Sequence, residues 1–241
     1  MSKLLIEQDF IDTANEIGCE VAAIKAVSEV EAPRGGFLPS GRPTILFEAH
    51  IFSAKTGHKY DAIYPKISSR KWNKKLYQGG EKEYDRLEQA KAIDENAALQ
   101  SASWGKFQVM GFNFRICGWD TVKSFVDDMY ISEGKHLKAF SGFIKSNNLG
   151  RHLISKNWAA FAKGYNGSAY KQNKYDEKMA KAYKKYAALA KTVVPVVEPV
   201  VEPTIDFPMV EIPQPEKPKV VPKSKSIFEV IIDVILSIFK K

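Results

Sequence analysis

The positions of proline limit what most of this 241-residue chain can form. No proline occurs between Pro65 and Pro195. Because proline breaks helices, that long stretch is free to be mostly helical, with glycine and asparagine marking the breaks. Asp120 and Ser132 are suitable N-cap residues within it. The apolar spacing predicts helices over 82–93, 95–101, 104–114, 121–130, 133–146, 157–164 and 173–190.

The N-terminal third predicts a different mixture of elements. Residues 33–43 carry three prolines and three glycines, which is typical of a loop, and 44–47 (TILF) has the composition of a short strand. The elements expected there are helices over 5–17 and 19–31, a loop over 33–43, a strand over 44–47, and a mainly loop segment with one short helix over 48–80. Residues 1–190 are therefore expected to form one α+β domain that is predominantly α, with a small β element.

The composition changes abruptly at Lys191. Eight of the twelve prolines lie between 195 and 222, in repeats such as VVPVVEPVVEP. Such a sequence builds neither a helix nor a sheet, so residues 191–226 are predicted to be an extended, semi-rigid linker.

The last stretch, residues 227–241 (IFEVIIDVILSIFKK), predicts an apolar, amphipathic C-terminal helix. Its length of about 20 Å is too short to cross a bilayer. A helix lying in a membrane interface fits this pattern, and self-association or docking on the body fits it equally well. The side chains expected to contact a membrane surface are Ile227, Phe228, Ile231, Ile235 and Phe239.

The net charge of +8 comes from residues 1–190, because the charges from Lys191 onward cancel. We interpret this charge as spread over helices with acidic neighbours, which favours an anionic partner but not nucleic acid. Two cysteines are too few for a disulfide framework, and the four histidines show no ligand spacing, so no metal or cofactor is expected. The N-terminus lacks the apolar region of a signal peptide, so we expect synthesis in the cytoplasm. We expect a monomer.

Glu31 is the first candidate for chemistry. Ile24, Val27 and Glu31 share one helical face, whereas Glu29 lies on the polar side. A carboxyl group on the core side of a helix C-terminus is costly to ionise, which raises its pKa toward the range of a general acid. The alternative, equally open from spacing alone, is a buried glutamate paired with Arg42 or Arg86.

Three further stretches combine aromatic residues with amides and carboxylates, as a carbohydrate site requires. SASWGKFQVMG (101–111) is expected to open a helix and to offer Ser103, Phe107 and Gln108. FAKGYNG (161–167) offers Tyr165 and Asn166, and LFEAH (46–50) places Glu48 and His50 on the same side of an extended segment. The alternative is that Trp104, Phe107 and Trp158 belong to the core and that Asn166-Gly167 is only a turn.

Taken together, these stretches resemble a known family. AIKAVSEVEA, GRPTILFEAH, SASWGKFQVMGFN and WAAFAKGYNGSAY are similar, in order and from about residue 7 to 187, to the N-acetylmuramidase family of phage and prophage endolysins, which has the lysozyme-like fold. Two of the motifs are also similar to goose-type lysozymes and lytic transglycosylases. The resemblance implies a peptidoglycan substrate, cleavage of the β-1,4 bond between N-acetylmuramic acid and N-acetylglucosamine, and Glu31 as the catalytic glutamate.

The resemblance also sets the remaining expectations. Glu31 would act as general acid, and Glu48, across the turn and strand, is the candidate second carboxylate. Ser103, Phe107, Gln108, Tyr165, Asn166 and His50 would contact substrate. An endolysin made without a signal peptide would reach the cell wall through holin-type release. Two alternatives stay open: a lytic transglycosylase acting on the same bond, and a membrane-permeabilising protein that acts through its C-terminal helix.

Overall fold

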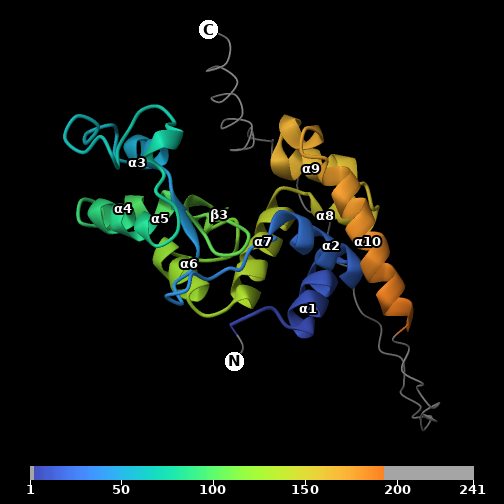
Figure 1. Cartoon of the computed structure of the whole chain (residues 1–241). Coiled ribbons are helices and arrows are strands. Elements are labelled where there is room, and N and C mark those ends of the chain that lie inside the picture. The colour runs from blue at the N-terminus through green and yellow to red at the C-terminus, as the bar shows by residue number, and fades with distance from the viewer. Residues whose placement is uncertain (1–2, 193–241) are drawn as a thin grey trace, which may run out of the picture. The chain divides into compact units, whose positions relative to one another are not determined.

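The computed structural model of the protein describes residues 3–192 (Figure 1). The chain divides after Leu189 into two units, and the arrangement given below is that of the first. The linker predicted over 191–226, beyond its first two residues, and the C-terminal helix predicted over 227–241 lie outside the described residues.

Most of the described elements are helices, and the sheet is small. The helices are α1 (Glu7–Ile17), α2 (Val21–Glu31), α3 (Ala49–Lys55), α4 (Lys82–Lys91), α5 (Glu95–Gln100), α6 (Val122–Met129), α7 (Glu133–Ser146), α8 (Gly150–Ile154), α9 (Trp158–Asn166) and α10 (Tyr175–Thr192). The strands are β1 (Ile45–Phe47), β2 (Ala102–Trp104) and β3 (Val109–Met110). Single turns of 3-10 helix are η1 (Lys74–Leu76), η2 (Gly111–Asn113) and η3 (Ser168–Lys171).

Apart from the helix predicted over 104–114, the ends of the predicted helices lie within two residues of those in the structure, and no prediction covers α8. The helix predicted over 133–146 has those bounds, and the Ser132 side chain caps it by accepting a hydrogen bond from the backbone N–H of Lys135. The helix predicted over 121–130 begins one residue later because Thr121, not Asp120, supplies the cap by accepting from the N–H of Ser124. Local capping chemistry therefore decides these boundaries.

The helix predicted over 104–114 is wrong. That segment contains the end of β2, then β3 and η2, and the three strands form an antiparallel sheet in the order β1-β2-β3, with Ile45 opposite Trp104 and Ser103 opposite Met110. Gly105 and Gln108 have positive φ angles of 70° and 50°, which an α-helix does not accommodate. The hairpin turns there and pairs with β1, which lies far away in the sequence.

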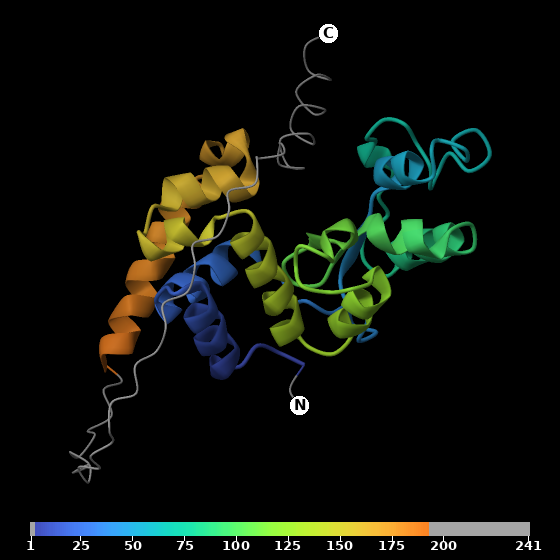
Figure 2. The same ribbon diagram turned by 180° about the vertical axis from the view of Figure 1, so that it is seen from behind.

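Helix α7 lies between two groups of elements in the first unit. On one side are the sheet and helices α3 to α6, and on the other are α1, α2 and α8 to α10; the view from behind shows the same order (Figures 1 and 2). Leu137, Phe140 and Ile144 of α7 are fully buried. Because this helix contributes to the core on both sides, it fixes the position of one group against the other.

A buried ion pair on α4 fixes the end of β1. The side chains of Glu83 and Arg86 are 0% and 2% exposed and lie 2.8 Å apart. Glu83 accepts hydrogen bonds from the N–H groups of Phe47, Gln78 and Gly79, and Arg86 donates to the carbonyl of Phe47. One carboxylate therefore holds both ends of the chain segment between β1 and α4.

No helix within residues 3–192 is both long enough and apolar enough to cross a membrane.

Candidate active site

Glu31 is the last residue of α2 and lies on its buried face. Ile24 and Val27, which precede it on this face, are 0% exposed, as the helical spacing predicts. Glu29, two residues earlier, points to the surface and binds Lys185 and Tyr186. The phase of the helix thus makes Glu31 half-buried and leaves Glu29 exposed.

The half-buried carboxyl group of Glu31 has an amide partner. The Asn166 side-chain NH₂ donates to Oε1 of Glu31 at 2.7 Å. Burial raises the pKa of Glu31 to about 7, although the hydrogen bond from Asn166 acts in the opposite direction by favouring the carboxylate. A group with this pKa holds its proton through much of the neutral range, so it can serve as a general acid there.

The alternative interpretation, that Glu31 is paired with an arginine, is wrong. Arg42 pairs with Glu81, and Arg86 pairs with Glu83. The burial of Glu31 is therefore not offset by a cation on either of these side chains, which is why its pKa rises.

The loop after Glu31 is held by α7. Glu133 of that helix accepts a hydrogen bond from the N–H of Gly36 at 2.6 Å. The ring of His136 lies so close that a Cβ on Gly36 would come within 2.5 Å of its Nδ1 atom. His136 is itself held, since its Nδ1 accepts from the N–H of Lys106 at 3.0 Å. The chain that leaves Glu31 is thus fixed against the β2-β3 turn.

Asn166 reaches Glu31 because Tyr165 and Gly167 fix the end of α9. The Tyr165 ring is packed against Phe140, Phe143 and Phe161. Its hydroxyl donates to the carbonyl of Phe107 at 3.4 Å, and Gly167, with a φ of 74°, ends the helix. Burial, followed by the nearby charge of Glu31, raises the pKa of Tyr165, so its hydroxyl stays neutral. Tyr165 packs against the core and positions the end of α9, and its neighbour Asn166 contacts Glu31.

Glu48 directly precedes α3 and belongs to a separate cluster of side chains, formed with His50 and Tyr77. The prediction that Glu48 and His50 share an extended segment is wrong, because the helix begins at Ala49. The two side chains are nevertheless in contact, with 3.2 Å between His50 Nδ1 and Glu48 Oε2. Tyr77 donates its hydroxyl to the same carboxylate, at 2.9 and 2.7 Å from the two oxygens.

Tyr77 and Trp72 are the residues of this region that sequence reasoning missed. The indole N–H of Trp72 donates to the Tyr77 hydroxyl at 2.7 Å, and the two rings are nearly perpendicular, 6.3 Å between centroids. Trp72 is 54% exposed. The only signal in the sequence is the presence of aromatic residues among lysines, and no spacing links Tyr77 to a glutamate 29 positions earlier.

The site residues predicted within 101–111 pack in the core or form hydrogen bonds within the β2-β3 hairpin. Phe107 is 4% exposed and stacks on Phe140 with 4.6 Å between ring centroids, and Trp104 is 1% exposed, so both belong to the core as the alternative interpretation holds. Gln108 donates to the carbonyls of Thr44 and Gly105 and accepts from the hydroxyl of Ser103. The exposed Gln108 side chain therefore braces the hairpin, and substrate contacts by Ser103 and Gln108 stay predictions.

In the part of the chain that the structure describes, no group of three or more His, Cys, Asp or Glu side chains is arranged to hold a metal ion.

The chain matches the family model described as "Muramidase: N-acetylmuramidase" over residues 20–187, a range that contains Glu31, Glu48 and Asn166. It is similar to the crystal structure of a Burkholderia AP3 phage endolysin, with a TM-score of 0.74 and 39% identity over 79% of this chain and 73% of that one. None of the curated proteins compared with the chain matches it.

Proposed function

The chain belongs to the N-acetylmuramidase family of glycoside hydrolases, and from this premise we propose that it is an endolysin whose general acid is Glu31. It cleaves the β-1,4 bond between N-acetylmuramic acid and N-acetylglucosamine in peptidoglycan and reaches the cell wall through holin-type release. The single observation that supports the residue assignment is the half-buried Glu31 carboxyl group, whose pKa is raised to about 7 by desolvation.

The proposed reaction begins with a proton transfer from Glu31. Its protonated carboxyl group donates to the glycosidic oxygen as the bond to the sugar breaks and positive charge develops on the anomeric carbon. Asn166, bonded to Oε1, holds the carboxyl group in one orientation and stabilises the carboxylate that remains. Glu48, fixed by Tyr77, is the proposed second carboxylate, which stabilises the cation or activates water.

The lytic transglycosylase alternative is favoured by one observation. Both oxygens of Glu48 already receive the Tyr77 hydroxyl, and the Glu48 side chain is 16% exposed, which limits its access to a reacting sugar. An enzyme that uses Glu31 alone would release an anhydro sugar, lighter by one water than the hydrolysis product. Mass spectrometry of the products separates the two reactions.

The assignment of Glu31 is tested by Glu31→Gln, which keeps the shape and the acceptor for Asn166 but removes the transferable proton. We expect lysis of purified cell walls to fall by about 10²–10⁴-fold, as for loss of a general acid. Glu29→Gln is the matched control because Glu29 lies on the same helix at the surface, and it should lyse walls like the wild type. Near-normal lysis by Glu31→Gln would contradict the assignment.

A further inference from the structure

The segment 55–75 accounts for most of the net positive charge of the chain. It contains seven lysines and arginines and one acid, Asp61, so its formal charge of +6 compares with +8 for all 241 residues. The expectation that the charge is spread over helices is wrong for this segment, because α3 ends at Lys55 and most of the cations that follow lie in loops. A concentration of this kind produces a local positive potential.

The single acidic residue of this segment binds other residues of the same segment. Asp61 accepts a hydrogen bond from the Ser68 hydroxyl at 2.6 Å and lies 3.4 Å from the guanidinium of Arg70. Ser68 and its neighbour Ile67 are 0% and 1% exposed and anchor the loop in the core. The Asp61 network therefore gives the loop a fixed conformation and leaves little negative charge at its surface.

The lysines of the loop are exposed and unpaired. In residues 3–192, no carboxylate lies within the 4.0 Å limit of an ion pair from five of these side chains. We call them, together with Tyr64 and Trp72, the basic loop surface; the five are Lys59, Lys66, Lys71, Lys74 and Lys75. Their charges are available to a partner.

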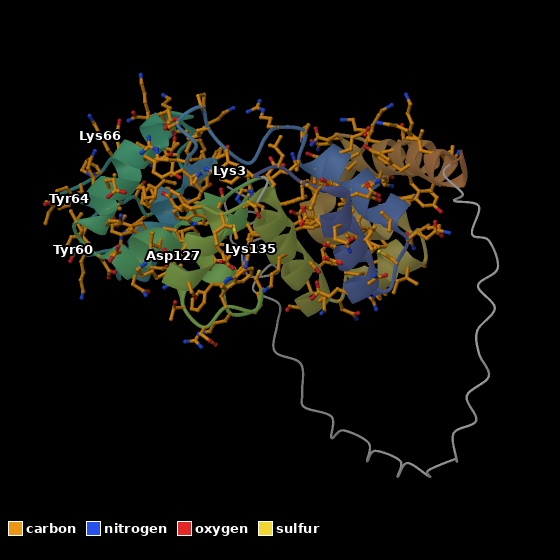
Figure 3. All side chains as sticks on the ribbon, turned by 90° about the horizontal axis from the view of Figure 1, so that it is seen from below. Lys3, Tyr60, Tyr64, Lys66, Asp127 and Lys135 are labelled. Atoms are coloured by element: carbon orange, nitrogen blue, oxygen red, sulfur yellow. The ribbon has the colours of Figure 1, made fainter. Side chains whose placement is uncertain are left out.

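Large apolar side chains lie among these lysines. Ile63, Tyr64 and Trp72 are 66%, 44% and 54% exposed, and the rings of Tyr60 and Tyr64 are 6.4 Å apart. Figure 3 shows Tyr60, Tyr64 and Lys66 together at one edge of the first unit. Aromatic rings beside cations suit a ligand that offers both sugar faces and carboxylates.

The basic loop surface is joined to the candidate active site by hydrogen bonds. Trp72 donates to Tyr77, and Tyr77 donates to Glu48. Only Tyr77 separates Trp72 from Glu48, so a polymer that passes Glu48 has Trp72 and the lysines that flank it in the sequence nearby.

We propose that the basic loop surface is a second substrate-binding surface, on which Trp72 stacks against a sugar ring of peptidoglycan and the lysines bind the carboxylates of its stem peptides. The inference rests on the proposed function, because that function supplies the polymer. Peptidoglycan fits both halves of the surface: its glycan strand has apolar sugar faces, and its peptides end in free carboxylates.

The charge part of the inference is tested with the full-length triple variant Lys66→Gln, Lys71→Gln and Lys74→Gln. Binding to purified sacculi, measured by co-sedimentation in the cold before the walls are lysed, should weaken about fivefold to tenfold at about 0.1 M salt, since each exposed ion pair contributes modestly. At about 1 M salt, where the Debye length is about 3 Å, wild type and variant should bind alike. The matched control is Lys171→Gln, Lys181→Gln and Lys184→Gln, which removes equal charge from exposed positions in η3 and α10 and should bind like the wild type.

The stacking part is tested with a neutral ligand. A β-1,4-linked N-acetylglucosamine hexamer has no carboxylates, so the triple variant should bind it as the wild type does in titration calorimetry. Trp72→Ala should lose about tenfold or more in affinity for both the hexamer and sacculi, and Trp72→Phe should regain part of it.

Several outcomes would overturn the inference. Equal losses in the two triple variants would mean that net charge alone matters. If the first triple variant bound sacculi like the wild type, the lysines would not bind peptidoglycan. If the hexamer did not bind, or if Trp72→Ala did not weaken its binding, Trp72 would not stack on a sugar ring. Tighter binding of duplex DNA or of anionic phospholipid vesicles than of sacculi would assign the surface to another partner. Sedimentation needs no cleavage, so full lysis by Glu31→Gln would defeat the proposed function without deciding this inference.

Discussion

Two opposing influences set the pH at which Glu31 releases its proton. Burial raises the pKa to about 7, and the Asn166 amide opposes that rise because it donates to the charged form. The position of Glu31 on the buried helix face could be predicted from spacing with Ile24 and Val27. Its partner could not, because Asn166 is 135 residues away and only the packing of α9 brings it near.

Replacing Asn166 should move the pH profile of lysis. In the wild type, activity should fall as the pH rises through about 7, because the acid must be protonated to act. Asn166→Ala removes the influence that lowers the pKa of Glu31, so this decline should shift to higher pH, with a lower maximal rate because the carboxyl group is less well oriented. The measurement is the initial rate of wall lysis against pH. A decline that stays in place in Asn166→Ala would show that another group controls it.

Glu31 should also make the protein less stable as the pH rises. Its folded-state pKa of about 7 lies above the ordinary value of 4.5, so between these values the folded state binds more protons than the unfolded state. The stability that protonation gives is complete below about pH 4.5 and is lost as the pH rises through about 7. Glu31→Gln, which does not ionise, should therefore match the wild type near about pH 4 and be more stable by about 2–3 kcal/mol near about pH 8. Urea unfolding at the two pH values measures this difference. An equal stability of the two proteins at the higher pH would show that ionised Glu31 carries no cost.

At the scale of elements, helices were predictable and the sheet was only partly so. The Ser132 cap and the apolar spacing of α7 act within a few residues, so local sequence contains the information. The β2-β3 hairpin was mistaken for a helix because its strands are short and because β1, the partner of β2, lies far away in the sequence: Leu46 pairs with Ser103, 57 residues later. The start of α3 at Ala49 was likewise hidden, since Glu48 caps it through backbone geometry without a side-chain cap bond.

The α4 ion pair should be important for stability because it holds β1 and the segment leading to α4. Glu83→Gln would leave the Arg86 guanidinium buried without its counter-charge, and we expect the free energy of unfolding to fall by about 3–5 kcal/mol. Glu81→Gln is the control two positions earlier, where the side chains of Glu81 and its partner Arg42 are about 40% exposed, and its effect should be far smaller. Urea unfolding of the three proteins checks this expectation. Similar losses in the two variants would contradict the special role of the buried pair.

At the scale of the whole molecule, the family match covers the residues of the candidate active site, and the net positive charge concerns the proposed binding of the polymer. The family match covers residues 20–187 and accounts for the catalytic unit. The predicted linker and the predicted C-terminal helix lie beyond that range, and their role stays a prediction. The sign of the net charge could be predicted from the sequence alone. Its distribution on the surface could not, because only the structure links the loop over 55–75 to Glu48, through Trp72 and Tyr77.

Deleting residues 193–241 separates wall cleavage from any action on membranes. The truncated chain keeps α1 to α10, so lysis of purified walls should stay within about twofold of the full chain, as expected for removal of a segment outside the catalytic unit. Killing of intact cells by full-length Glu31→Gln, lost on the same deletion, would support a membrane-permeabilising activity of the C-terminal helix. Equal killing with and without residues 193–241 would refute that activity.

The hydrogen bond between Asn166 and Glu31 also has a consequence for protein synthesis. The two residues are 135 positions apart, so a nascent chain has emerged through α9 before the bond can form. Until then Glu31 lacks its amide partner and the packing of Tyr165 beside it. A growing or truncated chain that ends before α9 therefore lacks the amide that contacts Glu31 in the folded protein.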